Sequence, residues 1–213
     1  MCYQIISPAH LHLQQDFSVW TDLLAARLLI QVVANLKRYY PFADITTHTT
    51  GYVSRINQND VKKLEAEGKI DNYEGSTEIG KLGIEKYYED YLHGVTGSSK
   101  VEVNSHGQVV RTLNFDPPEP GKDITLTLDI RLQYYAQEIF GKMKGAVVAI
   151  EPSTGEILAM YSNPSYDPNP FVRGIRGGEY QRLLNNPGHP LINRATQGGY
   201  APASTVKPLM CLM

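Results

Sequence analysis

Three prolines and a glycine fall within residues 115–123, whose sequence is FDPPEPGKD. Proline fixes φ and lacks a backbone N–H, so this run excludes a helix and the interior of a sheet, and it keeps the chain extended. A chain of 213 residues is long enough for one large or two small hydrophobic cores. We therefore place a domain junction at this run.

The part before the junction mixes helical and extended patterns. Residues 43–51 are rich in β-branched side chains, which favours an extended segment. Asp60 stands where it can cap a short helix that ends at Gly68. Residues 100–113 alternate apolar and polar side chains around the turn sequence NSHG, which predicts a β-hairpin.

A second helix is expected over residues 76–94, where apolar side chains recur at helical spacing and Gly94 can end the helix. Tyr87, Tyr88 and Tyr91 lie on its apolar face. We expect these tyrosines to pack in the core, because large aromatic side chains are usually buried there. A platform on which a ligand stacks is the alternative.

The part after the junction opens with ITLTLD, residues 124–129, whose strict alternation predicts a strand, and Asp129 can then cap a helix. Two apolar runs flank the turn sequence EPSTG at residues 151–155, which predicts an antiparallel hairpin. Since neither run alternates clearly, both strands are expected to be buried on both faces. The helix after Asp129 is expected to bury one apolar stripe, formed by Leu132, Tyr135, Ala136, Ile139, Phe140 and Met143.

The charge balance and the metal-binding residue types exclude several classes of function. The formal net charge is -2 and the isoelectric point is about 6.3, so no basic field exists to hold a nucleic acid, which we exclude as a partner. Cys2 and Cys211 lie outside any ligand spacing, and the six histidines are scattered. We expect neither a metal nor another cofactor.

The longest apolar stretch, residues 23–36, is too short to cross a bilayer. It carries Arg27, Gln31 and Asn35 on one helical stripe, which predicts a packed amphipathic helix rather than a membrane anchor. The first ten residues lack the charged-then-apolar order of a secretion signal. We therefore expect neither an anchor nor an export signal in these residues.

A candidate catalytic pair stands near the C-terminal end. Ser204 and Lys207 are three residues apart, so both lie on one face if a helix begins near Pro202. A serine hydroxyl becomes a useful nucleophile when a neighbouring base removes its proton, and lysine is such a base only when uncharged. The pattern alone leaves two hypotheses open, a catalytic serine or a solvent-exposed helix start.

Several separated segments resemble the class B penicillin-binding proteins of the elongation type, in the order of that family and from about Lys37 to the end. Two segments of this chain, SNPSYDPNPF and LINRATQGGYAPASTVKP, resemble the part of the family's sequence that leads into the active site. Three further segments of this chain resemble the pedestal region of the family: RYYPFADITTHTTGYVSRIN, IGKLGIEKYYEDYLHGVTG and KVEVNSHGQVVRTLNFDPPEPGKDITLTLDIRLQ.

This resemblance implies an α+β fold and a division into four segments. Residues 37–116 would form a pedestal of the dimerisation type, and 117–122 a linker. Residues 123–213 would form the N-terminal part of a transpeptidase domain related to the β-lactamases. Residues 1–36 match the family poorly.

The resemblance also implies the chemistry. Ser204 would be the acyl-accepting nucleophile and Lys207 its general base, in transfer of a D-alanyl-D-alanine stem peptide onto a neighbouring strand's amine during peptidoglycan cross-linking. β-Lactams would acylate the same serine. Arg194, in the sequence NRA, would support the site structurally. The parent protein would face the periplasm from the inner membrane.

The sequence departs from the family in two respects. The family's Ser-x-Asn and Lys-Thr-Gly motifs do not follow within the six residues after Lys207, and Ala203 stands where the family usually has glycine. We therefore expect the isolated chain to be an inactive fragment of an enzyme. One alternative is a non-catalytic module whose pedestal binds a membrane glycan polymerase; another, a small β-lactam sensor or hydrolase, leaves the pedestal-like half unexplained.

Overall fold

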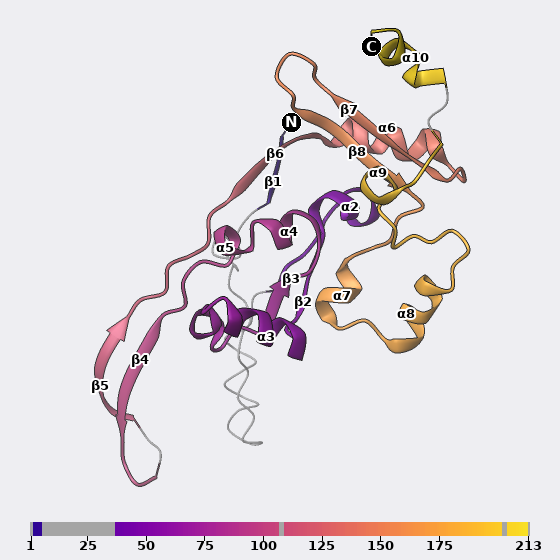
Figure 1. Cartoon of the computed structure of the whole chain (residues 1–213). Helices are drawn as coiled ribbons and strands as arrows, with labels where there is room; N and C mark the ends of the chain where they lie inside the picture. Colours follow the sequence, from indigo (N-terminus) through magenta and orange to yellow (C-terminus); the bar gives the residue numbers. More distant parts are fainter. Residues whose placement is uncertain (1, 6–36, 107–108, 202–203, 213) are drawn as a thin grey trace.

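The computed structural model describes residues 2–5, 37–106, 109–201 and 204–212 (Figure 1). The amphipathic helix expected over residues 23–36 lies outside these ranges, as do Pro202 and Ala203. The fold mixes short helices with four two-stranded antiparallel sheets, which confirms the α+β class. No helix among the described residues is long and apolar enough to cross a membrane.

The part before the proline run contains short helices, a small sheet and a long hairpin. The small sheet joins β2 to β3, and the hairpin joins β4 to β5 and extends away from the rest of the molecule (Figure 1). The elements are η2 (Ala43–Ile45), α2 (Thr47–Thr50), β2 (Val53–Arg55), α3 (Gln58–Ala66), η3 (Ile70–Tyr73), β3 (Glu78–Gly80), α4 (Gly83–Tyr87), α5 (Glu89–Leu92), β4 (Ser98–Val103) and β5 (Val109–Asp116).

The part after the proline run is built on a second hairpin, β7–β8, with α6 packed against β8. Strand β6 pairs with β1 (Cys2–Ile5) from the start of the chain. The elements are β6 (Ile124–Asp129), α6 (Ile130–Phe140), β7 (Gly145–Ile150), β8 (Ile157–Asn163), α7 (Asn169–Arg173), α8 (Gly177–Leu184), α9 (Arg194–Gln197), η4 (Ser204–Val206) and α10 (Lys207–Cys211).

The turn residues and helix caps in the sequence correctly predicted two hairpins and the start of α6. Both hairpins form around NSHG and EPSTG, and β6 forms where the alternation predicts it. The Asp129 side chain caps α6 by accepting a hydrogen bond from the N–H of Arg131. Gly68 and Gly94 both have positive φ, as expected of residues that end helices.

The cap of α3 lies one turn earlier than predicted. Asn57, not Asp60, is the N-cap, and its side chain accepts hydrogen bonds from the N–H groups of Asn59 and Asp60. The Asp60 carboxylate accepts in return from the N–H of Asn57, at 2.8 Å. The two residues form a capping box, so Asp60 stabilises the helix start from its third position.

The prediction of an extended segment over residues 43–51 was wrong, because this segment forms η2 and α2. The Thr47 hydroxyl donates to the carbonyl of Ala43 at 2.7 Å, and the Thr50 hydroxyl donates to that of Thr46 at 3.0 Å. These side-chain bonds satisfy the hydroxyl groups within the helical turns, but bonds of this kind do not themselves stabilise a helix. Tertiary contacts of α2 with α4 and β8 outweigh the β-propensity of threonine.

The single helix predicted over residues 76–94 is also wrong. Its first residues form β3 in the sheet with β2, and the remainder forms two separate short helices, α4 and α5. Gly83 begins α4 with a φ of 60°, and a Cβ added to it would collide with the backbone of Thr49 and Gly51. A glycine is thus required at this close contact between α2 and α4.

Tyr87, Tyr88 and Tyr91 were predicted to pack in the core, and this prediction is wrong. Tyr87 is 82% exposed, and Tyr88 and Tyr91 are 43% and 48% exposed. The three residues belong to α4 and α5 or to the position between them, and these helices are too short to bury a continuous apolar face.

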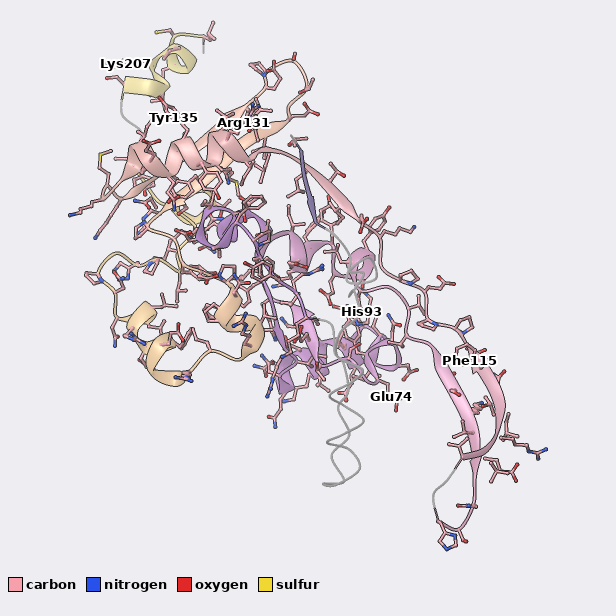
Figure 2. The ribbon with its side chains drawn as sticks, turned by 180° about the vertical axis from the view of Figure 1, so that it is seen from behind. Glu74, His93, Phe115, Arg131, Tyr135 and Lys207 are labelled. Atoms are coloured by element: carbon pink, nitrogen blue, oxygen red, sulfur yellow. The ribbon has the colours of Figure 1, made fainter. Side chains whose placement is uncertain are left out.

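The apolar stripe predicted for α6 is likewise mostly exposed. Ala136 is buried, but Tyr135, Ile139 and Met143 are 55–61% exposed, and Figure 2 shows Tyr135 on the outer side of the helix. Among the described residues, no element covers this side. Strand β7 is half-exposed too, so the prediction of burial on both faces fails for it.

Helix α6 packs inward through a residue that the pattern did not select. The Gln133 side chain is fully buried, and its Nε2 donates to the carbonyls of Ile45 (3.3 Å) and Met160 (3.2 Å). Its Oε1 accepts from the N–H of Met160 at 2.9 Å. One amide therefore binds α6 to both η2 and β8, on opposite sides of the proline run.

A buried ion pair anchors α4. Glu85 is 1% exposed; Arg38 lies 2.9 Å from its carboxylate, and the Tyr40 hydroxyl donates to it at 3.0 Å. Burial, and then the adjacent carboxylate, raise the pKa of Tyr40, so its hydroxyl remains a donor. The same hydroxyl accepts from the N–H of Val53 at 2.9 Å, which links the pair to β2.

We predict that Glu85→Gln lowers the free energy of unfolding by about 3 kcal/mol, because it leaves the Arg38 guanidinium inside the protein without its counter-charge. Urea denaturation at pH 7 measures this change. Glu102→Gln, which removes the partner of exposed Arg111, is the control and should cost less than about 1 kcal/mol. Equal losses in the two variants would contradict the prediction.

Candidate active site

Ser204 and Lys207 lie on consecutive helical turns at the end of the described chain. Ser204 begins η4, and Lys207 begins α10, beyond the outer side of α6 (Figures 1 and 2). Both side chains are exposed. Within the described ranges, no hydrogen bond joins the two residues, and their predicted roles stay predictions.

The segment that leads to Ser204 starts from a fixed point. The N–H of Arg194, the first residue of α9, donates to the buried hydroxyl of Ser162 on β8 at 3.0 Å. Its guanidinium donates to the carbonyls of Gly188 and His189. These bonds to backbone agree with the structural role that the sequence predicts for Arg194.

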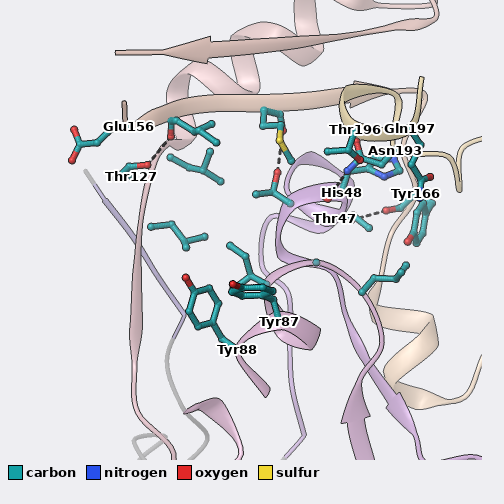
Figure 3. A pocket seen from close by; sticks show the side chains of 18 of the residues that line it. Thr47, His48, Tyr87, Tyr88, Thr127, Glu156, Tyr166, Asn193, Thr196 and Gln197 are labelled. Carbon is teal, nitrogen blue, oxygen red and sulfur yellow. Dashed lines mark hydrogen bonds between the residues drawn. The ribbon is translucent and has the colours of Figure 1, made fainter. Parts of the chain in front are cut away.

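A cavity of about 630 Å³ lies between α2, α4, β6, β8 and α9 (Figure 3). Its wall is mainly apolar, and neither Ser204 nor Lys207 is part of it. The wall includes Thr47, His48, Leu82, Tyr87, Tyr88, Leu126, Leu128, Glu156, Ile157, Met160, Tyr166, Asn193 and Gln197. Sequence reasoning missed this cavity because segments far apart in the chain form it, and no local motif marks it.

His48 is a buried titratable group of this wall, and its surroundings perturb its pKa. Burial lowers its pKa to about 4, and the charge of Arg194 adds to the shift. The ring packs edge-on against Tyr166, with centroids 5.6 Å apart. In the part of the chain that the structure describes, its buried Nε2 has no hydrogen-bond partner. His48 is therefore neutral at pH 7.

A metal site is absent from the described ranges, where no three His, Cys, Asp or Glu side chains stand close enough to hold an ion.

Two family models match successive parts of the chain. The model of the penicillin-binding protein dimerisation domain matches residues 26–126, and the model of the penicillin-binding protein transpeptidase domain matches residues 145–213. Ser204 and Lys207 fall within the second match.

A curated relative is similar over most of this chain. Peptidoglycan D,D-transpeptidase MrdA of Escherichia coli K12 is 52% identical over 183 residues, which are 86% of this chain. The chain spans 29% of the length of that relative.

Two solved structures resemble the fold closely. Pseudomonas aeruginosa PBP2 in complex with WCK 5153 is 43% identical, with a TM-score of 0.72 over 85% of this chain and 36% of that chain. Helicobacter pylori PBP2 in complex with MreC is 31% identical, with a TM-score of 0.74 over 92% of this chain and 36% of that chain.

From the lowered pKa of His48 we predict how the free energy of unfolding depends on pH. Between pH 6.5 and 4 the unfolded chain takes up a proton on this residue while the folded chain does not, so stability falls as the pH falls through this window. The contribution is on the order of 2 kcal/mol. His48→Asn should remove it, so the variant should lose less free energy of unfolding than wild type between pH 7 and pH 4.

Urea denaturation at several pH values measures the difference. The exposed His106, in the turn of the β4–β5 hairpin, supplies the control, and His106→Asn should retain the wild-type pH dependence. An unchanged pH dependence in His48→Asn would show that another group is responsible.

Proposed function

This chain belongs to the penicillin-binding proteins, and on that premise we propose that it acts in a serine-type peptidoglycan D,D-transpeptidase that cross-links the wall during cell elongation. The observation that carries the proposal is the order of the two family matches, with Ser-x-x-Lys inside the second. We assign the pedestal to residues 37–116, the linker to 117–122 and the start of the transpeptidase domain to 123–213. By the same resemblance, the protein works at the periplasmic face of the inner membrane.

In the proposed mechanism, the Ser204 hydroxyl attacks the carbonyl between the two D-alanines of a stem peptide. Lys207 accepts the hydroxyl proton and delivers it to the amine of the departing D-alanine, and an ester to Ser204 remains. The amine of a neighbouring stem peptide then attacks this ester. It gives up a proton through Lys207, and the cross-link forms as the serine hydroxyl is restored. A β-lactam acylates Ser204 by the first step.

The described residues alone do not enclose this pair. Both side chains are exposed, and the apolar side of α6 nearest to α10 is uncovered. Acyl transfer requires donors fixed around the reacting carbonyl and exclusion of competing water. We therefore propose that the 213 residues by themselves are inactive and that the activity belongs to a longer form of the protein.

Intact mass spectrometry after incubation with a penicillin tests the proposal. We predict an adduct of one penicillin on the longest natural form of the protein, loss of the adduct in Ser204→Ala, and no adduct on the folded 213-residue chain. Lys207→Ala should slow adduct formation by at least about 100-fold. A folded long form that stays unmodified, or a Ser204→Ala variant that is still modified, would refute the assignment.

A second role concerns a protein partner. The Helicobacter pylori neighbour was solved with MreC, which is not a glycan polymerase. The β4–β5 hairpin of this chain offers exposed apolar side chains that suit a protein contact, with Val110 and Phe115 each 62% exposed (Figure 2). We propose that the pedestal binds a protein of the elongation machinery, either an MreC-like protein or a membrane glycan polymerase.

Binding to each candidate is measured separately with the long form. Phe115→Ser should weaken binding of the true partner about tenfold or more, because a half-exposed aromatic side chain is typical of an interface anchor. Asn114→Ser, on the same strand, should leave the affinity within about twofold. If neither candidate binds a folded pedestal, the interaction hypothesis is wrong, whatever the outcome of the penicillin experiment.

A further inference from the structure

Asn193 bonds to both sides of the proline run with one side chain. Its Oδ1 accepts from the N–H of Ala195 at 3.1 Å and so caps α9. Its Nδ2 donates at 3.0 Å to the carbonyl of His48 in α2, and Figure 3 shows this bond at the wall of the cavity. The two contacts use the acceptor and the donor of the amide at once.

The His48 carbonyl is an orphan acceptor that the short helix α2 creates. Carbonyls in the last turn of a helix have no partner within it, and α2 has four residues. The Asn193 amide satisfies this carbonyl from 145 residues away in the sequence. The bond is therefore a tertiary contact rather than part of the local turn.

Helix α9 is the last element before the nucleophile. Six residues, 198–203, separate its end from Ser204. The first of them, Gly198, packs so tightly that an added Cβ would lie 2.5 Å from both the Arg194 carbonyl and the Tyr200 ring. The orientation of α9 thus fixes the start of this connection. The bond from the Arg194 N–H to the Ser162 hydroxyl holds α9 against β8, and the bond from Asn193 to the His48 carbonyl holds α9 against α2.

We propose that Asn193 is a positioning residue. It holds helix α9, from which the chain leads on to Ser204, against helix α2, and through α2 against the pedestal. The inference rests on the proposed role of Ser204 as the nucleophile. Asn193 does not touch the reacting atoms; it sets the direction in which the chain leaves α9. Loss of its donor should misplace Ser204 while the cap of α9 remains.

Asn193→Asp separates these two functions of the side chain. An ionised carboxylate is nearly isosteric and still accepts from Ala195, but it cannot donate to the His48 carbonyl. When protonated, the carboxyl can do both. The variant should therefore be impaired at pH 7 and recover as the pH falls towards the ordinary carboxyl value of about 4.

The matched control is Asn169, at the start of α7. Its Nδ2 donates to the Tyr40 carbonyl and its Oδ1 accepts from the Tyr40 N–H, both at 3.0 Å. It joins the same two parts of the chain, but it does not lie on the element that precedes Ser204. The Asn169 Nδ2 also donates to the Asp167 carboxylate at 2.8 Å. Asn169→Asp thus makes the same chemical change in a bridge between the same two parts and also places two carboxylates side by side, which makes it the more disruptive of the two variants locally.

The experiment measures the rate of acylation of the long form by a fluorescent penicillin. We expect Asn193→Asp to be about tenfold slower than wild type at pH 7, and the deficit to shrink at pH 4.5. Asn169→Asp should stay within about twofold at both pH values. An unimpaired Asn193→Asp, an equal loss in the control, or a deficit independent of pH would each overturn the proposal.

Amide hydrogen exchange on the 213-residue chain separates this proposal from the assignment of Ser204. We expect Asn193→Asp to speed exchange over residues 194–201 at pH 7, and Asn169→Asp to leave it unchanged. If wild type is not acylated, the function assigned to Ser204 fails while faster exchange still supports the tie. Unchanged exchange in Asn193→Asp overturns the tie whether or not acylation occurs.

Discussion

The Gln133 carboxamide is the interaction on which the arrangement of the two parts depends. A buried amide is costly unless its donors and acceptor are all bonded, and here the partners come from η2 and β8. In its native position helix α6 therefore needs both of these elements beside it. The parts of the chain before and after the proline run are therefore packed against each other at this point.

Further hydrogen bonds from side chains to backbone carbonyls join the parts of the chain before and after the proline run. Thr49 donates from α2 to the carbonyl of Met160, and Ser165 donates to that of Asp44. The Thr47 hydroxyl shares its one proton between the carbonyls of Ala43 and Tyr166, which lie 2.7 and 2.8 Å away. Side-chain hydroxyls and amides meet backbone carbonyls at each of these points. Because hydrogen bonds are directional, this contact fixes orientation more tightly than apolar packing alone would. That orientation determines where α9, and with it the segment leading to Ser204, begins.

The sequence predicted those features that depend on local chemistry. Turn residues located both hairpins, and a side-chain cap located the start of α6. The assignment of Ser204 and Lys207 as a catalytic pair stays a prediction. Features that depend on distant partners escaped it. The helix at Thr47 follows from tertiary contacts that override β-propensity. The inward side of α6 is set by a polar residue that a search for apolar periodicity passes over.

The hydrogen bonds between the parts also have an evolutionary consequence. Every residue type carries a backbone carbonyl, so Ile45, Phe171 and Met160 can change identity without loss of the acceptor that each supplies. The donors have no such freedom, since only a few residue types place a hydroxyl or amide at the required point. Substitutions should therefore accumulate on the acceptor side. Chimaeras that exchange the part before the proline run between related proteins should assemble wherever these few donors are retained.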